Sequence, residues 1–449
     1  MNKLLKKILG FGLVCGSFWT THSYGQDTLY LTFREAVSIA QSKNLDYKIT
    51  ENNLEVLRKE KQVATLSHLP TAGISTNLAR QTGQQFQQVE GEIVVTNVTN
   101  EIVSSNLNLN MPVFNSGRRI LDTQSADLAL KAGEKGLDRA KQLVIFDVAR
   151  RYLQVLLDEE LLRIASENLE NQKQQLVQIE GFVEAGLRTV SDLYNQQSEV
   201  ARLESVKVDA EIQLENDRWS LSEYLQLDAG VIPVLEKVNP ESERESFLEM
   251  ELNQLYELAQ SNRSDLTQQR LLSDSFKKDM QAVKAMYFPR INAFYSYNTF
   301  FTSLDSRSMR EQLLRIYPQN TLGLSLVVPI FSSFQTRLDV TRSRVTYQNQ
   351  LLRTESVDRK VFQDVKLAHQ NYLAAIRKEK NAQVQVLAAD EASKAVSERF
   401  RLGLSSFVDL ATANQTLVRA QADQAQTVFT LYFQEVLMKY ALGILEVED

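Results

Sequence analysis

Two long stretches of the chain carry apolar residues at the spacing of a helix that packs against other helices along its whole length. They cover about residues 118–182 and 336–401, and no proline interrupts either one. The apolar positions recur about every 3.5 residues, at Val144, Val148, Tyr152, Val155, Leu162, Val361, Val365, Tyr372 and Ile376. At about 1.5 Å per residue each helix is roughly 100 Å long. The pattern therefore predicts two very long helices with coiled-coil packing.

Shorter helices accompany each long one. A returning helix follows a glycine turn, at about residues 192–226 and 409–445, and another precedes the strands, at about residues 33–67 and 252–286. Two such helices placed end to end match one long helix in length. We therefore expect an even-walled cylinder.

Between the first helix and the long helix, apolar and polar residues alternate with period two, which predicts two pairs of strands at about residues 71–113 and 290–330. One face carries Leu107, Leu109, Met111, Leu322, Leu324 and Leu326. The other face carries Asn106, Asn108, Asn110, Thr321, Gly323 and Ser325. Polar loops at residues 80–101 and 304–319 are expected to join each pair. Aromatic residues near the strand ends favour a transmembrane β-barrel, and hairpins of a soluble β-domain are the alternative.

Short motifs recur along the chain. Ala-Gln-Ser at residues 40–42 returns at residues 259–261, and Pro-Val-Phe at residues 112–114 is matched by Pro-Ile-Phe at residues 329–331. The offset is 217–219 residues, and both halves have the order helix, strand, strand, long helix, helix. The chain is therefore interpreted as a tandem duplication.

We expect a first repeat at residues 26–227 and a second repeat at residues 252–449, joined by an acidic linker at residues 228–251. Their helical hairpins are expected at about residues 118–226 and 336–445. Four strands cannot close a barrel and would leave unpaired edges. Three copies would supply twelve strands and close the sheet.

The first 25 residues read as a secretory signal peptide. Three lysines precede an apolar run at residues 8–19, and Ser23-Tyr24-Gly25 gives a cleavage site before Gln26. A lipid anchor on Cys15 is the alternative, although Val14 stands where a small residue is expected. The protein is therefore expected to be exported.

The composition of the chain excludes several classes of protein. The chain has 50 Lys and Arg against 56 Asp and Glu, a net charge of −6, and 43% hydrophobic residues. These values exclude a disordered chain and a polytopic helical membrane protein, and no stretch of 18 apolar residues follows residue 25. Without a block of basic residues, no nucleic-acid partner is expected.

Candidate chemistry is sparse in the mature chain. It has no cysteine, and His68 and His369 stand at non-equivalent positions of the two repeats. The mature chain therefore lacks the residues that a metal centre or a thiol nucleophile would need. We therefore expect no enzyme activity, no metal and no cofactor.

The doubled motifs resemble the TolC-like outer-membrane efflux protein family. They are Pro-Val-Phe-Asn-Ser-Gly-Arg at residues 112–118, Pro-Ile-Phe at residues 329–331, and the Gly-Leu turns followed by aspartate at residues 186–192 and 403–409. The resemblance spans nearly the whole mature chain. It implies an α+β membrane protein: a homotrimer whose 12-stranded β-barrel sits in the lipid of a Gram-negative outer membrane and continues as a coiled-coil α-helical tunnel into the periplasm.

The same resemblance implies the exit duct of a tripartite efflux or type I secretion system. Such a duct docks onto a periplasmic adaptor protein and an inner-membrane pump of RND or ABC type, and conducts its cargo passively. The alternative is a periplasmic coiled-coil adaptor or structural protein. An adaptor should have one long hairpin flanked by compact β-domains, whereas this sequence has the hairpin twice.

Two sets of site residues follow from the resemblance, both at the turns of the long hairpins. The residues expected to contact the adaptor are Gly186, Leu187, Thr189, Gly403, Leu404 and Ser406. The alternative is structural, with glycine ending one helix and Ser191 or a nearby hydroxyl capping the next.

The gate and selectivity set comprises Arg188, Ser191, Asp192, Phe400, Arg401, Ser405 and Asp409. This sequence departs from the family at Ser405, which holds the place of an arginine, and at Phe400, which lacks a tyrosine hydroxyl. Thr412 also stands where a second aspartate is expected. We hypothesise that Arg188 and Arg401 supply substitute charges, and that a ring of Asp409 favours cations. A solvated carboxylate at a helix N-terminus is the alternative for Asp409.

Overall fold

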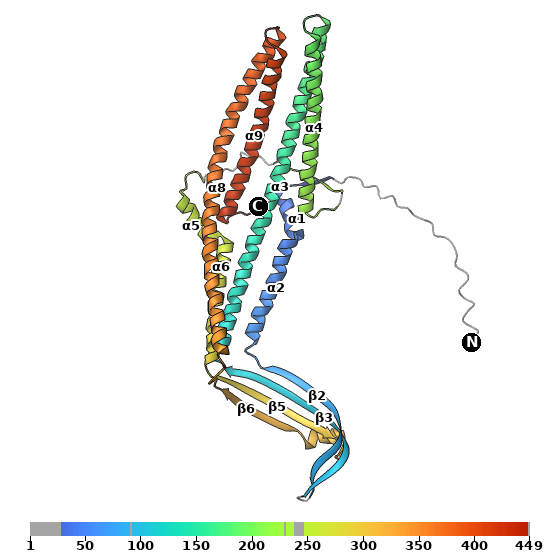
Figure 1. Cartoon of the computed structure of the whole chain (residues 1–449), viewed down its shortest axis with the longest axis vertical. Coiled ribbons are helices and arrows are strands. Elements are labelled where there is room, and N and C mark those ends of the chain that lie inside the picture. Colours follow the sequence, from blue (N-terminus) through green and yellow to red (C-terminus); the bar gives the residue numbers. More distant parts are fainter. Residues whose placement is uncertain (1–27, 90–91, 229, 238–246, 448–449) are drawn as a thin grey trace, which may run out of the picture.

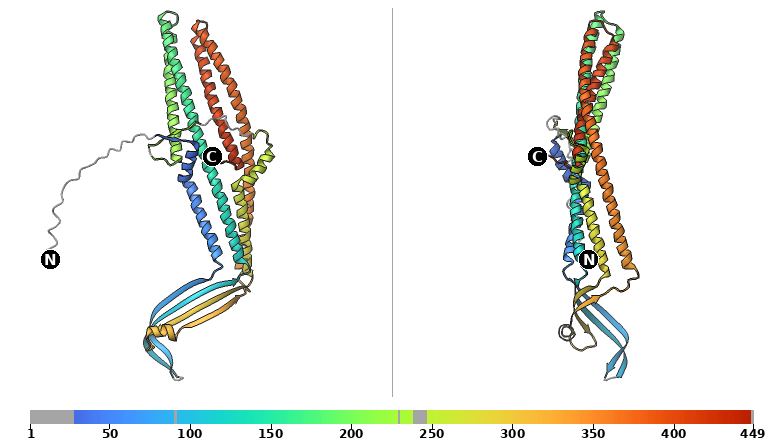
Figure 2. Two further views of the ribbon diagram at one scale, coloured as in Figure 1. Left: turned by 180° about the vertical axis from the view of Figure 1, so that it is seen from behind. Right: turned by 90° about the vertical axis from the view of Figure 1, so that its left-hand side faces the viewer.

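The protein is an elongated rod with a β-sheet at one end and helices along the rest (Figure 1). The computed structural model describes residues 28–89, 92–228, 230–237 and 247–447. The predicted signal peptide, with Cys15, lies outside the described residues. Figure 2 shows that the rod is much thinner in one direction than in the other, so one chain forms a curved slab.

Two helices of 67 residues, α3 (Arg118–Glu184) and α8 (Gln335–Arg401), run most of the length of the rod. The returning helices are α4 (Val190–Tyr224) and α9 (Phe407–Leu442), close to the bounds that the sequence predicts. Both hairpins turn at the end of the rod opposite the sheet (Figure 1). None of the helices in the described ranges combines the length and apolar character that a membrane span requires.

The helix predicted before each pair of strands is broken in two. The first is α1 (Phe33–Lys43) and α2 (Leu45–Leu66), and the second is α5 (Leu252–Asn262) and α6 (Ser264–Lys284), which ends in the short 3-10 turn η1 (Ala285–Tyr287). Extended backbone at Asn44 and Arg263 makes the breaks. The Asn44 side chain accepts a hydrogen bond from the Tyr47 amide (2.9 Å) and caps α2. The expectation of a single helix was wrong. The breaks could not be recognised from the sequence, because neither contains proline or glycine.

A two-stranded parallel sheet lies beside the middle of the rod. Strand β1 (Thr28–Leu31) pairs with β4 (Ile232–Leu235), so the linker predicted at residues 228–251 contains regular structure that the sequence did not reveal. The buried Tyr152 hydroxyl lies 3.1 Å from the Leu31 carbonyl oxygen and 2.8 Å from that of Glu236. The small sheet is thereby held against α3.

The large sheet contains β2 (Thr71–Val89), β3 (Glu92–Phe114), β5 (Arg290–Thr302) and β6 (Gln319–Val327), antiparallel throughout in the order β2-β3-β5-β6. The two predicted hairpins therefore join through β3 and β5. Most of the loop predicted at residues 80–101 is strand instead. Its sequence lacks apolar alternation, but its backbone pairs across the hairpin without interruption from Arg80 to Val89. The loop predicted at residues 304–319 contains α7 (Met309–Glu311) and the π-turn η2 (Gln312–Ile316).

The two faces of the large sheet differ in chemistry. Ile74, Leu78, Leu322 and Leu324 lie on one face and are 73–81% exposed in the single chain. Amides line the opposite face, where Asn106 donates a hydrogen bond to Asn298 across β3 and β5. An apolar face this exposed requires an apolar environment outside the chain.

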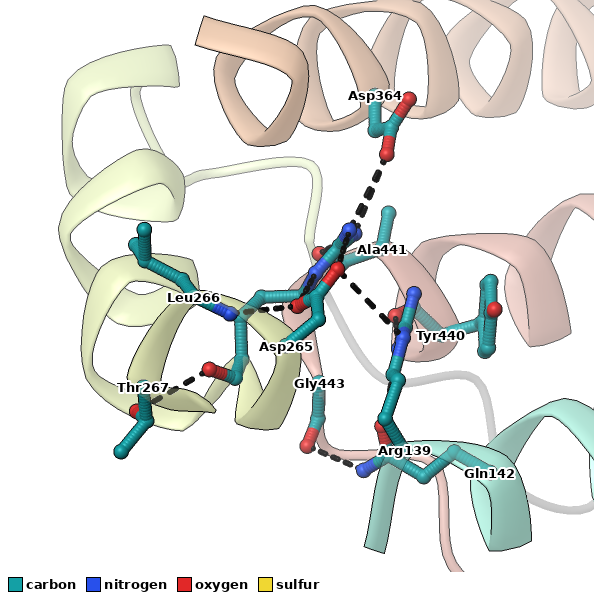
Figure 3. A network of polar contacts seen from close by, with 10 residues as sticks. Arg139, Gln142, Asp265, Leu266, Thr267, Asp364, Tyr440, Ala441 and Gly443 are labelled. Atoms are coloured by element: carbon teal, nitrogen blue, oxygen red, sulfur yellow. Dashed lines mark hydrogen bonds and ion pairs between the residues drawn. The ribbon is translucent and has the colours of Figure 1, made fainter. Parts of the chain in front are cut away.

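A buried arginine, Arg263, stands at the break between α5 and α6, and its partners Asp265 and Asp364 are labelled in Figure 3. Arg263, 2% exposed, donates to the Asp265 carboxylate (2.7 and 2.8 Å) and to Asp364 of α8 (3.3 Å). Burial raises the pKa of Asp265, but the hydrogen bonds and charge of Arg263 outweigh it and leave that pKa below its usual value. The ion pair therefore stays charged and fastens the break between α5 and α6 to α8.

Arg139 of the first repeat completes this junction. It donates to the Tyr440 carbonyl oxygen of α9 (3.0 Å), and its guanidinium lies 3.6 Å from the centre of the Tyr440 ring. Gly443 ends α9 with φ 77°, and a Cβ there would come within 2.9 Å of the backbone of Asn262 and Arg263. Only glycine fits this approach.

A buried carboxyl group of α3, Asp158, lies next to the half-buried Asp217 of α4, nearer the tips. Asp158 is 3% exposed, accepts a hydrogen bond from Gln154 at Oδ1 (3.1 Å), and has no donor at Oδ2 within the described residues. Burial and the adjacent Asp217 raise the pKa of Asp158 to about 7. At the equivalent position, 217 residues on, the second repeat has a buried alanine, Ala375.

Because the folded-state pKa of Asp158 is raised, folding binds a proton there, and the free energy of unfolding should fall as pH rises from about 4 to about 7. Asp158→Asn keeps the acceptor for Gln154 and cannot ionise. We expect this variant to flatten the fall and to raise the apparent melting temperature at pH 8 by about 2 °C or more, measured by circular dichroism at a fixed heating rate. Asp209→Asn, an exposed carboxylate on α4, is the control. An identical pH profile for the wild-type protein and Asp158→Asn would contradict the assignment.

Candidate functional site

The tips of the two helical hairpins are built alike. Gly186 and Gly403 take the left-handed conformation, with φ 73° and 78°. The Leu187 amide donates to the Phe182 carbonyl oxygen, and the Leu404 amide donates to that of Arg399, both at 2.8 Å. These bonds close α3 and α8 in the way that C-terminal glycines commonly do.

Each returning helix begins with a reciprocal cap. The Thr189 hydroxyl accepts from the Asp192 amide (3.2 Å), and Asp192 accepts from the Thr189 amide (3.3 Å). Ser406 and Asp409 repeat this arrangement at 3.2 and 3.0 Å. The cap of α4 is therefore Thr189 and not Ser191. Hydrogen bonds from the hydroxyl and amide of Ser406 lower the pKa of Asp409, which is ionised at neutral pH.

Large apolar side chains around both turns are exposed in the single chain. Leu187 is 70% exposed and Leu404 is 66% exposed. Four further residues of this kind, which the sequence interpretation did not single out, are 55–68% exposed: Val190, Tyr194, Leu402 and Val408. We call these six residues the apolar tip surface. A surface of this kind marks a contact with another protein more often than chance.

Arg188 and Phe400 form a polar link between the two tips. Arg188, in the turn of the first hairpin, donates to the Phe400 carbonyl oxygen, and its guanidinium lies 3.9 Å from the centre of the Phe400 ring. Phe400 is buried with Ile179 of α3 and Leu410 of α9. Both residues of this contact belong to the gate and selectivity set predicted from the sequence.

The other predicted gate residues are not brought together across the tips in one chain. Arg401 pairs with Glu398 of its own helix (2.9 Å), and the Ser405 hydroxyl donates to the Val396 carbonyl oxygen (3.4 Å). Asp192 and Asp409 bond to the caps of their own helices. Of the two arginines proposed to supply substitute charges, Arg188 alone reaches the opposite hairpin within the described residues.

A second polar link between the hairpins lies below the tips. Asn414 of α9 donates to Gln175 of α3 (3.3 Å) and accepts from Ser393 of α8 (3.0 Å). Nothing in the local sequence marks these amides, because the contact joins residues 239 positions apart.

In the described ranges, no group of three or more His, Cys, Asp or Glu side chains has the arrangement of a metal site. The chemistry of the tips is therefore that of caps, exposed apolar side chains and one cationic contact.

The chain is similar to known proteins over most of its length. The model of the outer membrane efflux protein family matches residues 36–225 and 255–430, once in each repeat. The outer membrane protein TolC of Escherichia coli strain K12 is 22% identical over 373 residues, which cover 82% of this chain and 74% of that protein.

Solved structures show the same fold. A crystal structure of CusC has a TM-score of 0.80 at 16% identity and covers 92% of both chains. The outer membrane protein VceC of Vibrio cholerae has a TM-score of 0.78 at 13% identity, over 92% of this chain and 96% of that one.

The family match covers most of the chain and includes both long hairpins. The protein is located in the outer membrane and extends into the periplasm, as an efflux channel of the TolC type. The family to which it belongs consists of channels and not of enzymes. We conclude that this chain belongs to the outer membrane efflux protein family.

Proposed function

We propose that three copies of this chain form the outer-membrane exit duct of a tripartite efflux or type I secretion system. The observation that carries the proposal is a four-stranded sheet with one exposed apolar face, whose two outer strands have no further strand partner in the described part of the chain, and which continues into helices of 67 residues. The duct conducts its cargo passively, without a catalytic step, and the pump supplies the energy.

The sheet can close only with the help of other copies. In the order β2-β3-β5-β6 every pair is antiparallel, so β6 of one copy can pair antiparallel with β2 of the next. Three copies give twelve strands, enough for a barrel with a lumen and no free edges. The apolar face that carries Leu322 and Leu324 then faces lipid, and the amides of Asn106 and Asn298 line the lumen.

The apolar tip surface supports docking of a periplasmic adaptor. It combines large exposed apolar side chains with glycines at the two turns, which let another helix approach closely. The docking residues are then Gly186, Leu187, Thr189, Gly403, Leu404 and Ser406, with the four newly identified apolar neighbours. An inner-membrane pump of RND or ABC type completes the assembly.

Arg188 supports a gate at the same tips. Its two partners on Phe400, a carbonyl oxygen and a ring, are uncharged, and they hold the hairpins together where polar links between them are few. Opening then corresponds to separation of the tips while the middle of the rod stays fixed.

Detergent-purified protein tests the duct directly. We expect a mass three times that of one chain and single-channel conductance after insertion into planar bilayers. A monomer or dimer without conductance would overturn the duct and favour the alternative, a periplasmic coiled-coil adaptor or structural protein.

Arg188→Gln tests the gate. A charge-assisted hydrogen bond contributes about 1.5–3 kcal/mol, so its loss should raise the open-to-closed ratio roughly tenfold, seen as longer open times in single-channel records. Arg401→Gln is the matched control, because that guanidinium pairs within its own helix. The gate assignment fails if both variants behave alike.

Asp409→Asn tests the selectivity ring. Asparagine keeps the hydrogen-bond acceptor for Ser406 and removes three negative charges per trimer, so we expect the cation-to-anion permeability ratio to fall by roughly twofold. The ratio follows from reversal potentials in a salt gradient. Asp192→Asn removes the equivalent carboxylate of the first repeat. A change with Asp192→Asn and none with Asp409→Asn would move the ring to the other turn.

A further inference from the structure

The connection between β5 and β6 is a rigid turn and not a loose loop. Gln312 is fully buried in it and donates to the Arg307 carbonyl oxygen (2.7 Å), and the Thr302 amide donates to Gln312 Oε1 (3.0 Å). Arg307 pairs in turn with Asp305. The shape of residues 303–317 is therefore fixed by their own contacts. Figure 1 shows this turn at the end of the sheet remote from the helices.

The helical part of the turn contacts the apolar face of the sheet, whereas Tyr317, just before β6, stacks on Phe300 of the opposite face (4.1 Å between ring centres). The Leu313 carbonyl oxygen of the turn accepts a hydrogen bond from the Thr299 hydroxyl (2.7 Å), and Thr299 is 8% exposed. Thr299 is two residues from Tyr297, which pairs with Leu107, so all three side chains lie on the same face. This is the face that meets lipid in the proposed barrel.

The same face changes from apolar to charged at the level of the turn. The next residue pair on this face after Leu78 and Val103 is the ion pair of Arg80 with Glu101 (3.5 Å). The Ser303 amide, where the turn begins, donates to the Glu101 carbonyl oxygen (2.9 Å). Charged pairs do not occur in the hydrocarbon of a bilayer without cost, so the turn stands at the level of the lipid headgroups.

Residues 309–316 of the turn combine exposed cations with exposed apolar side chains. Arg310 and Arg315 are exposed and form no ion pair within the described residues, unlike Arg307. Leu314 is 63% exposed and Met309 is 43% exposed. Glu311 is the only acid among residues 309–316, which leaves the segment net positive.

We propose that residues 309–316 bind the phosphate-bearing headgroup of an outer-leaflet lipid. Arg310 and Arg315 bind phosphate oxygens through their guanidinium groups, and Leu314 and Met309 rest on the upper part of the acyl chains. The same chemistry explains a turn that is rigid, placed on the lipid side and provided with cations that the chain itself does not neutralise. The proposal rests on the barrel of the proposed function, because only a closed barrel turns this face to the membrane.

The test uses the purified full-length trimer, with diphosphoryl lipid A as the probe and the same lipid without its phosphates as the comparison. Retained lipid is quantified by native mass spectrometry. We expect the wild-type trimer to prefer the diphosphoryl lipid, and Arg310→Gln/Arg315→Gln to weaken its binding roughly five- to tenfold. Arg344→Gln/Arg353→Gln, which removes two exposed arginines from α8, is the matched control and should bind as the wild type does.

Trimer mass and bilayer conductance are measured on the same preparations, so that the two proposals fail separately. A conducting trimer that retains both lipids equally, or whose double variant at 310 and 315 retains as much diphosphoryl lipid as the wild type, would overturn the lipid site alone. Protein that neither trimerises nor inserts would overturn the barrel and the lipid site with it.

Discussion

The structure depends on one constraint: a helix of 67 residues needs apolar partners along its whole length, and no single returning helix in this chain is that long. Each long helix is therefore covered by different helices in its two halves. Where the partners change, helix ends meet in the middle of the rod, and their backbone groups need new partners. Asn44 provides one for the start of α2 beside α3, and Arg263 provides one for the Ala441 carbonyl oxygen at the end of α9 beside α8.

The contacts between the two repeats differ between the middle of the rod and the tips. At the middle, Arg139 of the first repeat binds α9 of the second, so the repeats are fastened to each other by buried polar contacts. At the tips, Arg188 binds the carbonyl oxygen and ring of Phe400, and a small apolar cluster of Ile179, Phe400 and Leu410 lies between the hairpins, while much of the surrounding surface is exposed. Separating the tips breaks one arginine contact and exposes this small cluster, whereas separating the middle would leave the buried charge of Arg263 without its partners.

The sequence predicts features whose cause is local. Long helices follow from apolar spacing without proline, and the ends of those helices follow from Gly186 and Gly403. The breaks at Asn44 and Arg263 were missed because both residues are compatible with a helix, and tertiary contacts decide their conformation. The outer half of the β2-β3 hairpin was missed because its stability lies in backbone pairing, which leaves no apolar pattern. At the tips, the caps are readable within four residues, but Asn414 and Gln175 are far apart in sequence and carry no mark of their contact.

The residues at the tips differ from the family pattern in the position of the cation. The second repeat has Ser405 where the family has an arginine, and the first repeat has Arg188 beside its turn. Arg188 reaches Phe400, so the cation comes from the opposite hairpin and its acceptors are a backbone oxygen and an aromatic face. Neither acceptor titrates, whereas the strength of a salt bridge depends on an ionised carboxylate. In the proposed gate, closure therefore does not depend on an ionised carboxylate, and Asp409 stays hydrogen-bonded to the cap of its own helix.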